Sequence, residues 1–288
     1  MSNPSKEFHR PESWSQAHSL LNRSDVHTIL FTVSPRPTAL NDYNVDAFVD
    51  LEKLQSSYIQ IKDDGRVHIG ALTTLQDIYL SELVKTIAGG VLTEAAYLSA
   101  TLGLRNLATI AGTISNPENP PDLPLVLMAM DAVVIVQQAQ DQIRQVTLQD
   151  WMKDCGNALQ TGEVILEVSF PDLSLATGAL ARVSRTPRDK AIVAAAAVLM
   201  LENGVCSQVG VSLAGSNPTS VRLAQVEALL NGQALSADLL DEAASLAAKQ
   251  TAPPADYRGS AEYRTAMAAV LTRRALSMAA KIDSGLGK

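Results

Sequence analysis

The sequence predicts an α+β protein that folds into two domains. Its 288 residues exceed the roughly 100–200 residues of an ordinary domain. Strand-like and helical segments occur in both halves, and in the second half the expected strands come first and the expected helices last. This order is typical of helices packed on one face of a sheet. Since 47% of the residues are hydrophobic and only 4% are aromatic, we expect an aliphatic core.

In the first half, hydrophobic spacing and turn residues define the elements. Trp14, Ala17 and Leu21 fall on one helical face, and Asp64-Gly65 is a turn signal between two short alternating strands. A capping-box pattern at Thr73 begins the next helix. In order, the expected elements are a helix at 14–21, a strand at 27–33, a hairpin of strands 58–61 and 67–69, helices at 73–86, 93–102 and 122–130, and strands at 132–137, 143–148 and 164–170.

Pro171 ends the last of these strands, so we expect a first domain at residues 1–172 and a second at 173–288. The second domain begins with three expected strands, whose turn at Glu202-Asn203-Gly204 predicts an antiparallel sheet. Helices complete it. The strands are expected at 179–185, 191–201 and 205–213, and the helices at 221–231, 238–250 and 260–282.

Composition excludes several classes of function. The net charge of −7 and the absence of a basic block argue against nucleic-acid binding. Cys155 and Cys206 lie far apart, and the four histidines lack the spacing of metal ligands, so we expect no metal site. The longest uninterrupted apolar stretch, 191–201, is far shorter than a membrane span. We therefore expect a cytoplasmic protein without membrane insertion.

One segment, residues 105–122, combines short hydroxyl side chains with Gly112 and ends at the expected start of a helix. Backbone amides, hydroxyls and a helix N-terminus suit a phosphate-containing ligand. A plain surface loop between two helices is the alternative interpretation of the segment taken alone.

Several motifs together resemble the flavin-binding subunits of the molybdenum hydroxylases, the family of xanthine dehydrogenase and carbon monoxide dehydrogenase. They extend in unbroken order from about residue 58 to residue 276. The motifs are RVHIGALTTLQDI (66–78), LRNLATIAGTI (104–114), DLPLVLMAMDA (122–132), GEVILEVSFP (162–171), ALARVSRTPRDKAIVAAAAVLML (179–201) and DYRGSAEYRTAMAAVLTRRAL (256–276).

This resemblance implies an FAD-binding domain of the vanillyl-alcohol-oxidase type, with a small lobe at about residues 1–55 and a larger lobe at about 56–172. A C-terminal α+β domain would follow. It also implies two partners, a small subunit with iron–sulfur clusters and a large molybdopterin subunit. Electrons would pass from them through FAD to NAD or another acceptor, so that the flavin carries the chemistry and no catalytic side chain is expected.

The second flavin motif of the family, TIGGN, corresponds to Thr109-Ile110-Ala111-Gly112-Thr113. The resemblance implies that Thr109 bonds the phosphate or ribityl region and that Gly112 allows close backbone approach. Ala111 and Thr113 depart from the motif, although Thr113 retains a hydroxyl. Asp122 would hold a ribityl hydroxyl or cap its helix, and Arg182 would touch the flavin.

The first flavin motif departs further. Relatives carry a glycine-rich loop after the first strand, whereas this chain reads Ser34-Pro35-Arg36-Pro37-Thr38. The two prolines have no N–H to donate, and each lost bond to a charged phosphate is worth about 1.5–3 kcal/mol. Ser34, Arg36 and Thr38 are the side chains expected to compensate.

Two functions of different class follow. The first is an FAD-carrying electron-transfer subunit with an unusual pyrophosphate loop. The alternative is a flavin-free structural or assembly subunit descended from such a flavoprotein. A free-standing flavin oxidase is a weaker third interpretation, because 288 residues leave no separate substrate domain.

Overall fold

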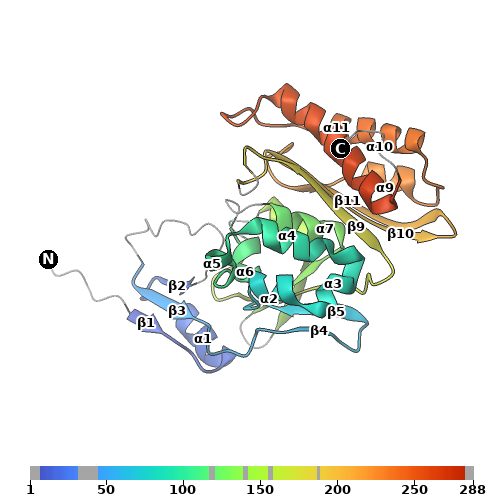
Figure 1. Ribbon diagram of the computed structural model, residues 1–288. Helices are drawn as coiled ribbons and strands as arrows, with labels where there is room; N and C mark the ends of the chain where they lie inside the picture. Colours follow the sequence, from blue (N-terminus) through green and yellow to red (C-terminus); the bar gives the residue numbers. More distant parts are fainter. Residues whose placement is uncertain are drawn as a thin grey trace.

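The computed structural model describes residues 7–31, 45–116, 121–138, 142–154, 158–186 and 189–282. These residues form three sheets, of three, five and four strands. Figure 1 shows the three-stranded sheet at the N-terminal end, the five-stranded sheet with its helices in the middle, and the four-stranded sheet beneath the C-terminal helices. We name the part with the three-stranded sheet, residues 7–54, the small lobe and the part with the five-stranded sheet the larger lobe.

The small lobe is a parallel sheet with one helix. Its strands β1 (Glu7–His9), β3 (Ala47–Asp50) and β2 (Thr28–Phe31) lie in that order, and β3 pairs in parallel with both neighbours. The helix α1 (Trp14–Leu21) packs against them through a small apolar cluster that includes Val164 of the larger lobe. All three strands therefore end at the same edge of the sheet.

The larger lobe carries an antiparallel sheet covered on one face by helices. The strand order is β4 (Ile59–Ile61), β5 (Arg66–Gly70), β8 (Val164–Pro171), β6 (Val133–Gln137) and β7 (Ile143–Thr147). The helices are α2 (Leu75–Leu80), α3 (Glu82–Thr86), α4 (Val91–Ser99), α5 (Leu102–Arg105), α6 (Ile110–Ile114), α7 (Asp122–Ala129) and α8 (Leu148–Lys153), with a 3-10 turn at Ile87–Gly90.

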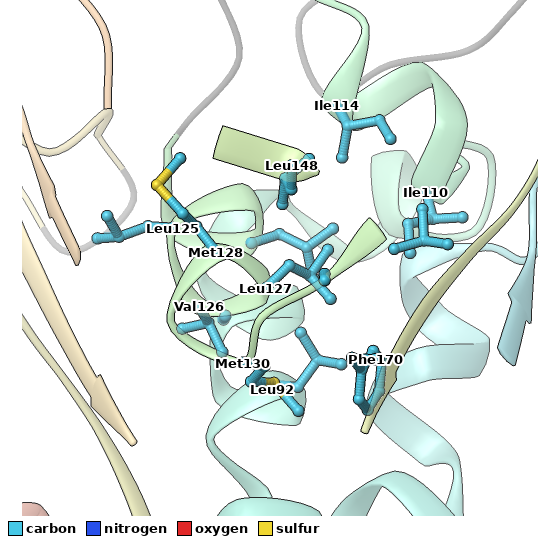
Figure 2. Close-up of a cluster of buried hydrophobic side chains, with 14 of the residues drawn as sticks. Leu92, Ile110, Ile114, Leu125, Val126, Leu127, Met128, Met130, Leu148 and Phe170 are labelled. Carbon is cyan, nitrogen blue, oxygen red and sulfur yellow. The ribbon is translucent and has the colours of Figure 1, made fainter. Parts of the chain in front are cut away.

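The helix α7 lies at the centre of the molecule. All eight of its residues are buried, as expected for a helix that is apolar on every side. Figure 2 shows Leu127 of this helix in one core with Ile110 and Ile114 of α6 and Phe170 of β8. The other side of α7 packs against the C-terminal sheet, where the Ser212 hydroxyl donates to the carbonyl oxygen of Leu125 at 2.7 Å.

The C-terminal sheet has four strands, not the three that the sequence predicts. The order is β12 (Val221–Arg222), β11 (Val205–Ala214), β10 (Val193–Glu202) and β9 (Thr177–Val183), all antiparallel. The segment 221–231, predicted as one helix, begins with β12, and α9 (Ala224–Leu230) follows. With α10 (Ala237–Lys249) and α11 (Ala261–Ala280), α9 covers the face of the sheet opposite α7.

Some predicted helix boundaries are wrong. The capping box is formed by Thr74 and Asp77, one residue after the predicted Thr73. The predicted helix 73–86 is broken at Ser81, whose hydroxyl accepts the Val84 amide and begins α3.

Within the described residues, no helix is both long and apolar enough to cross a membrane.

Candidate functional site

A cavity of about 450 Å³ lies between the small lobe and the larger lobe. One wall is formed by residues at the carboxyl edge of the parallel sheet, and the other by residues around α6 and the start of α2. The lining residues are Arg10, Leu30, Asp50, Leu51, Glu52, Leu54, Ser57, Ala71, Leu72, Thr74, Asn106, Leu107, Thr109, Ala111, Ser115, Leu159 and Ile165.

The small-lobe wall follows from the strand direction. Arg10 comes directly after β1, Leu30 lies near the end of β2, and Asp50 ends β3. Ligands of parallel sheets bind beyond the carboxyl ends of the strands, so this edge is the expected place for a cavity. Arg10 Nε donates to Asp50 Oδ2 at 3.0 Å, and the Glu52 amide donates to Asp50 Oδ1 at 3.0 Å.

The other wall is built around the N-terminus of α6. Thr109 is the N-cap of this helix, and its hydroxyl oxygen accepts the Gly112 amide at 3.1 Å. The amides of Ile110 and Ala111 donate to the carbonyl oxygens of Thr73 and Ala71 at 2.9 and 3.2 Å. The first amides of α6 are therefore already bonded within the protein, which leaves the Thr109 O–H as the donor that this turn can direct into the cavity.

The structure separates the residues of the second predicted motif. Thr109 and Ala111 line the cavity. Ile110 is fully buried in the hydrophobic core, and Thr113 is 1% exposed. The Thr113 hydroxyl, predicted to face a ligand, donates to the carbonyl oxygen of Thr109 at 2.7 Å. Gly112 and Thr113 thus hold the shape of the turn.

Asp122 and Arg182 form an ion pair at the boundary between the two domains. Arg182 Nε lies 3.1 Å from Asp122 Oδ1, and their side chains are 10% and 0% exposed. Burial raises the pKa of Asp122, and the positive charge of Arg182 opposes this rise. Neither residue is among those that line the cavity. The predicted side-chain cap at Asp122 is wrong, because α7 shows no such hydrogen bond.

The residues of the first predicted motif, Ser34, Arg36 and Thr38, lie outside the described residues.

Three cavity residues that the sequence analysis missed are Arg10, Asp50 and Glu52. Their signal is weak, because Asp50 and Glu52 follow only a three-residue apolar run, Ala47–Val49. Within the described ranges, no group of three or more His, Cys, Asp or Glu side chains is placed to hold a metal ion.

The lining of the cavity combines aliphatic side chains with hydroxyl, amide and charged groups. Such a surface suits a ligand with apolar rings and several hydroxyl groups, and a volume of about 450 Å³ falls within the roughly 300–1,000 Å³ of small-molecule sites.

Two models of known protein families together match most of the chain. A family model described as "FAD binding domain in molybdopterin dehydrogenase" matches residues 4–173. A second, "CO dehydrogenase flavoprotein C-terminal domain", matches residues 178–279.

Individual relatives agree. The chain is 30% identical over 232 residues to the glyceraldehyde dehydrogenase medium chain of Sulfolobus acidocaldarius, covering 80% of this chain and 82% of that protein. It is 32% identical over 236 residues to the 6-hydroxypseudooxynicotine dehydrogenase complex subunit alpha of Paenarthrobacter nicotinovorans, covering 80% and 78%.

A chain in the structure of carbon monoxide dehydrogenase from Hydrogenophaga pseudoflava superposes with a TM-score of 0.85 and 29% identity, covering 97% of this chain and 98% of that chain. Because the first family model alone matches more than half of the residues, and the fold agrees from end to end, the chain belongs to the FAD-binding medium subunits of the molybdopterin dehydrogenases, the oxidoreductase family of carbon monoxide dehydrogenase and xanthine dehydrogenase.

Proposed function

We propose that this chain binds FAD in the cavity between its lobes and passes electrons from iron–sulfur clusters of a partner subunit to NAD or another acceptor. The bound isoalloxazine ring would supply the redox chemistry. The protein would bind the cofactor, orient it and limit its contact with water. The relatives are named as a medium chain and as a subunit of a complex, which supports a small iron–sulfur subunit and a large molybdopterin subunit as partners.

One observation carries this proposal: residues of the second flavin motif line the same cavity as a residue of β2, the strand that precedes the first flavin motif in the sequence. Thr109 and Ala111 of the second motif line it, and so does Leu30 near the end of β2. Residues 34–38 follow that strand within a few residues. We propose that Ser34, Arg36 and Thr38 contact the pyrophosphate, because their segment occupies the place of the first flavin motif in the sequence.

We assign different roles to the other motif residues. The Thr109 O–H would donate to a phosphate or ribityl oxygen, and Thr113 would hold the turn through its bond to Thr109. Asp122 and Arg182 would act on the cofactor through the position of α7 against β9, since their ion pair joins these elements.

We propose the vanillyl-alcohol-oxidase type for the first domain, with the domain boundary between residues 172 and 173. Support comes from the position of two strands, since β8 ends at Pro171 and β9 begins at Thr177. The family models likewise end and begin at residues 173 and 178.

A second candidate function, a flavin-free structural subunit, is favoured by the bonding of α6. Because Ile110, Ala111 and Gly112 donate their amides to protein oxygens, this turn offers no nest of amides to a pyrophosphate. The charges in the described part of the lining also sum to a negative value, since Arg10 faces both Asp50 and Glu52.

Cofactor content separates the two functions. We expect the full chain, purified with its partners, to release roughly one FAD per chain on denaturation. Added FAD should raise the melting temperature of cofactor-depleted protein, because a ligand that binds only the folded state stabilises it. A protein that releases no flavin, takes up no added FAD and gains no stability from it would establish the flavin-free alternative.

A further inference from the structure

The cavity has an acidic corner where the small-lobe strands end. Arg10, Asp50 and Glu52 come together there because β1 and β3 run in parallel and end at the same edge. Asp50 is 13% exposed and Arg10 is 51% exposed, whereas Glu52 is 72% exposed. The three charges sum to one negative charge.

The two carboxylates differ in what they already bind. Asp50 uses one oxygen for Arg10 and the other for the Glu52 amide, each at 3.0 Å, so it fixes the position of both neighbours. The Glu52 carboxylate forms one ion pair within the described residues, with Arg10 Nη2 at 3.4 Å. An ionised carboxylate offers about four acceptor sites and no donor. Glu52, which lines the cavity, therefore retains acceptor capacity.

The negative charge and free acceptor sites of this corner favour the sugar hydroxyls of a dinucleotide over its phosphates. A phosphate brought to this corner would be repelled by the excess negative charge, and its oxygens would find no donor on Glu52. A sugar diol carries two O–H donors and no charge, which matches a carboxylate. An acidic side chain that follows a parallel strand plays this part in other dinucleotide folds, where it binds ribose hydroxyls.

We propose that Glu52 determines cofactor specificity by accepting hydrogen bonds from a vicinal diol of the bound FAD, and that Asp50 and Arg10 are positioning residues for it. This inference rests on the proposed function. FAD carries such hydroxyls in two places, the ribose of its adenosine half and the ribityl chain of its riboflavin half. The phosphates would lie away from this corner, toward the α6 wall.

The test measures the affinity of the full chain for FAD, ADP and FMN, in the unmodified protein and in Glu52→Ala. A charge-assisted hydrogen bond is worth enough to weaken binding by about tenfold or more when it is lost. We expect this loss for FAD. A parallel loss for ADP but not for FMN would place Glu52 at the ribose, and a loss for FMN but not for ADP would place it at the ribityl chain. Glu52→Gln, which keeps an acceptor oxygen, should lose less.

Two controls separate a hydrogen bond from a general charge effect. Glu82→Ala removes an 87% exposed carboxylate of α3 that forms an ion pair with Lys85, and it should leave all three affinities unchanged. 2′-Deoxy-ADP should bind the unmodified chain about tenfold more weakly than ADP if Glu52 holds the ribose, and Glu52→Ala should bind both nucleotides equally.

The outcomes are distinct. Increased FAD affinity in Glu52→Ala would show that Glu52 repels the phosphates, and unchanged affinity would show that Glu52 makes no net contribution to binding. Either result would overturn this inference while leaving the proposed function intact. If the unmodified chain binds neither FAD nor ADP, the proposed function fails, and this inference fails with it.

Discussion

Arg182 of β9 and Asp122 of α7 form a buried ion pair that joins the two domains, with Nε 3.1 Å from Oδ1. The pair connects α7 of the larger lobe to β9, the first strand of the C-terminal sheet along the chain. Removing one partner of such a pair leaves a buried charge uncompensated and costs about 3–5 kcal/mol.

We therefore expect Arg182→Met to lower the free energy of unfolding, measured by urea titration, by about 3–5 kcal/mol. Arg273→Met is the control, because the Arg273 guanidinium bonds the 57% exposed Asp241 and such surface pairs contribute about 0–1 kcal/mol. A loss no larger than that of the control would mean that Asp122 is compensated by other groups.

The same ion pair predicts that the free energy of unfolding depends on pH. Burial raises the pKa of Asp122 above its ordinary 3.8, so the unfolded chain releases this proton at a lower pH than the folded chain does. The stability contribution of Asp122 is therefore present below pH 3.8 and is lost as the pH rises toward the folded pKa. Without Arg182 the folded pKa rises further, so the destabilisation by Arg182→Met should shrink as the pH is lowered.

Glu163 predicts a pH dependence of stability with the opposite sign to that of Asp122. Arg144 donates to it through Nε and Nη2 at 2.8 and 2.6 Å, and Gln138 and the Gln160 amide add two more bonds. These bonds, Arg144 first, lower the pKa of Glu163 from 4.5 to about 2. Its stabilisation is present above pH 4.5 and is lost as the pH falls toward about 2.

Unfolding midpoints compared at about pH 7 and about pH 3 should differ less in Glu163→Gln than in the unmodified chain. The exposed Glu82→Gln should leave the difference unchanged. An equal pH dependence in Glu163→Gln and in the unmodified chain would assign the acid sensitivity to other carboxylates.

Local features of the fold could be predicted from the sequence. The turn between β10 and β11 is one example, because Asn203 and Gly204 adopt φ angles of 53° and 82°, and Asn-Gly favours these values. Another is α10, which is capped by Ser236 and begins at Ala237, one residue before the helix predicted at 238–250. Each of these depends on residues adjacent in the chain.

Short strands with distant partners could not be predicted. β1 and β3 have three and four residues, too few for a periodic pattern, and their partners lie far away in the chain. For the same reason Arg10 and Asp50 were missed as cavity residues, since only parallel pairing brings them together. Thr109 was found because its motif is contiguous.

The contact between the domains also depends on Gly210. A Cβ added at this position of β11 would overlap the carbonyl oxygen of Ala129, at the end of α7. We expect Gly210→Ala to destabilise the chain by about 1–3 kcal/mol, as overpacking does, with a lowered melting temperature. The control is Gly103→Ala in α5, where an added Cβ meets no atom within 4 Å, and it should be neutral or slightly stabilising.

Thr109 provides a prediction that separates binding from folding. Its hydroxyl caps α6, as the Ser236 hydroxyl caps α10, so alanine at either position should cost about 1 kcal/mol of stability. Of these two capping residues, only Thr109 lines the cavity. Thr109→Ala should therefore also weaken FAD binding, by about tenfold if the lost bond is to a phosphate, whereas Ser236→Ala should not. Thr109→Ser should restore both properties, and equal FAD affinity in the two alanine variants would show that Thr109 acts as a cap alone.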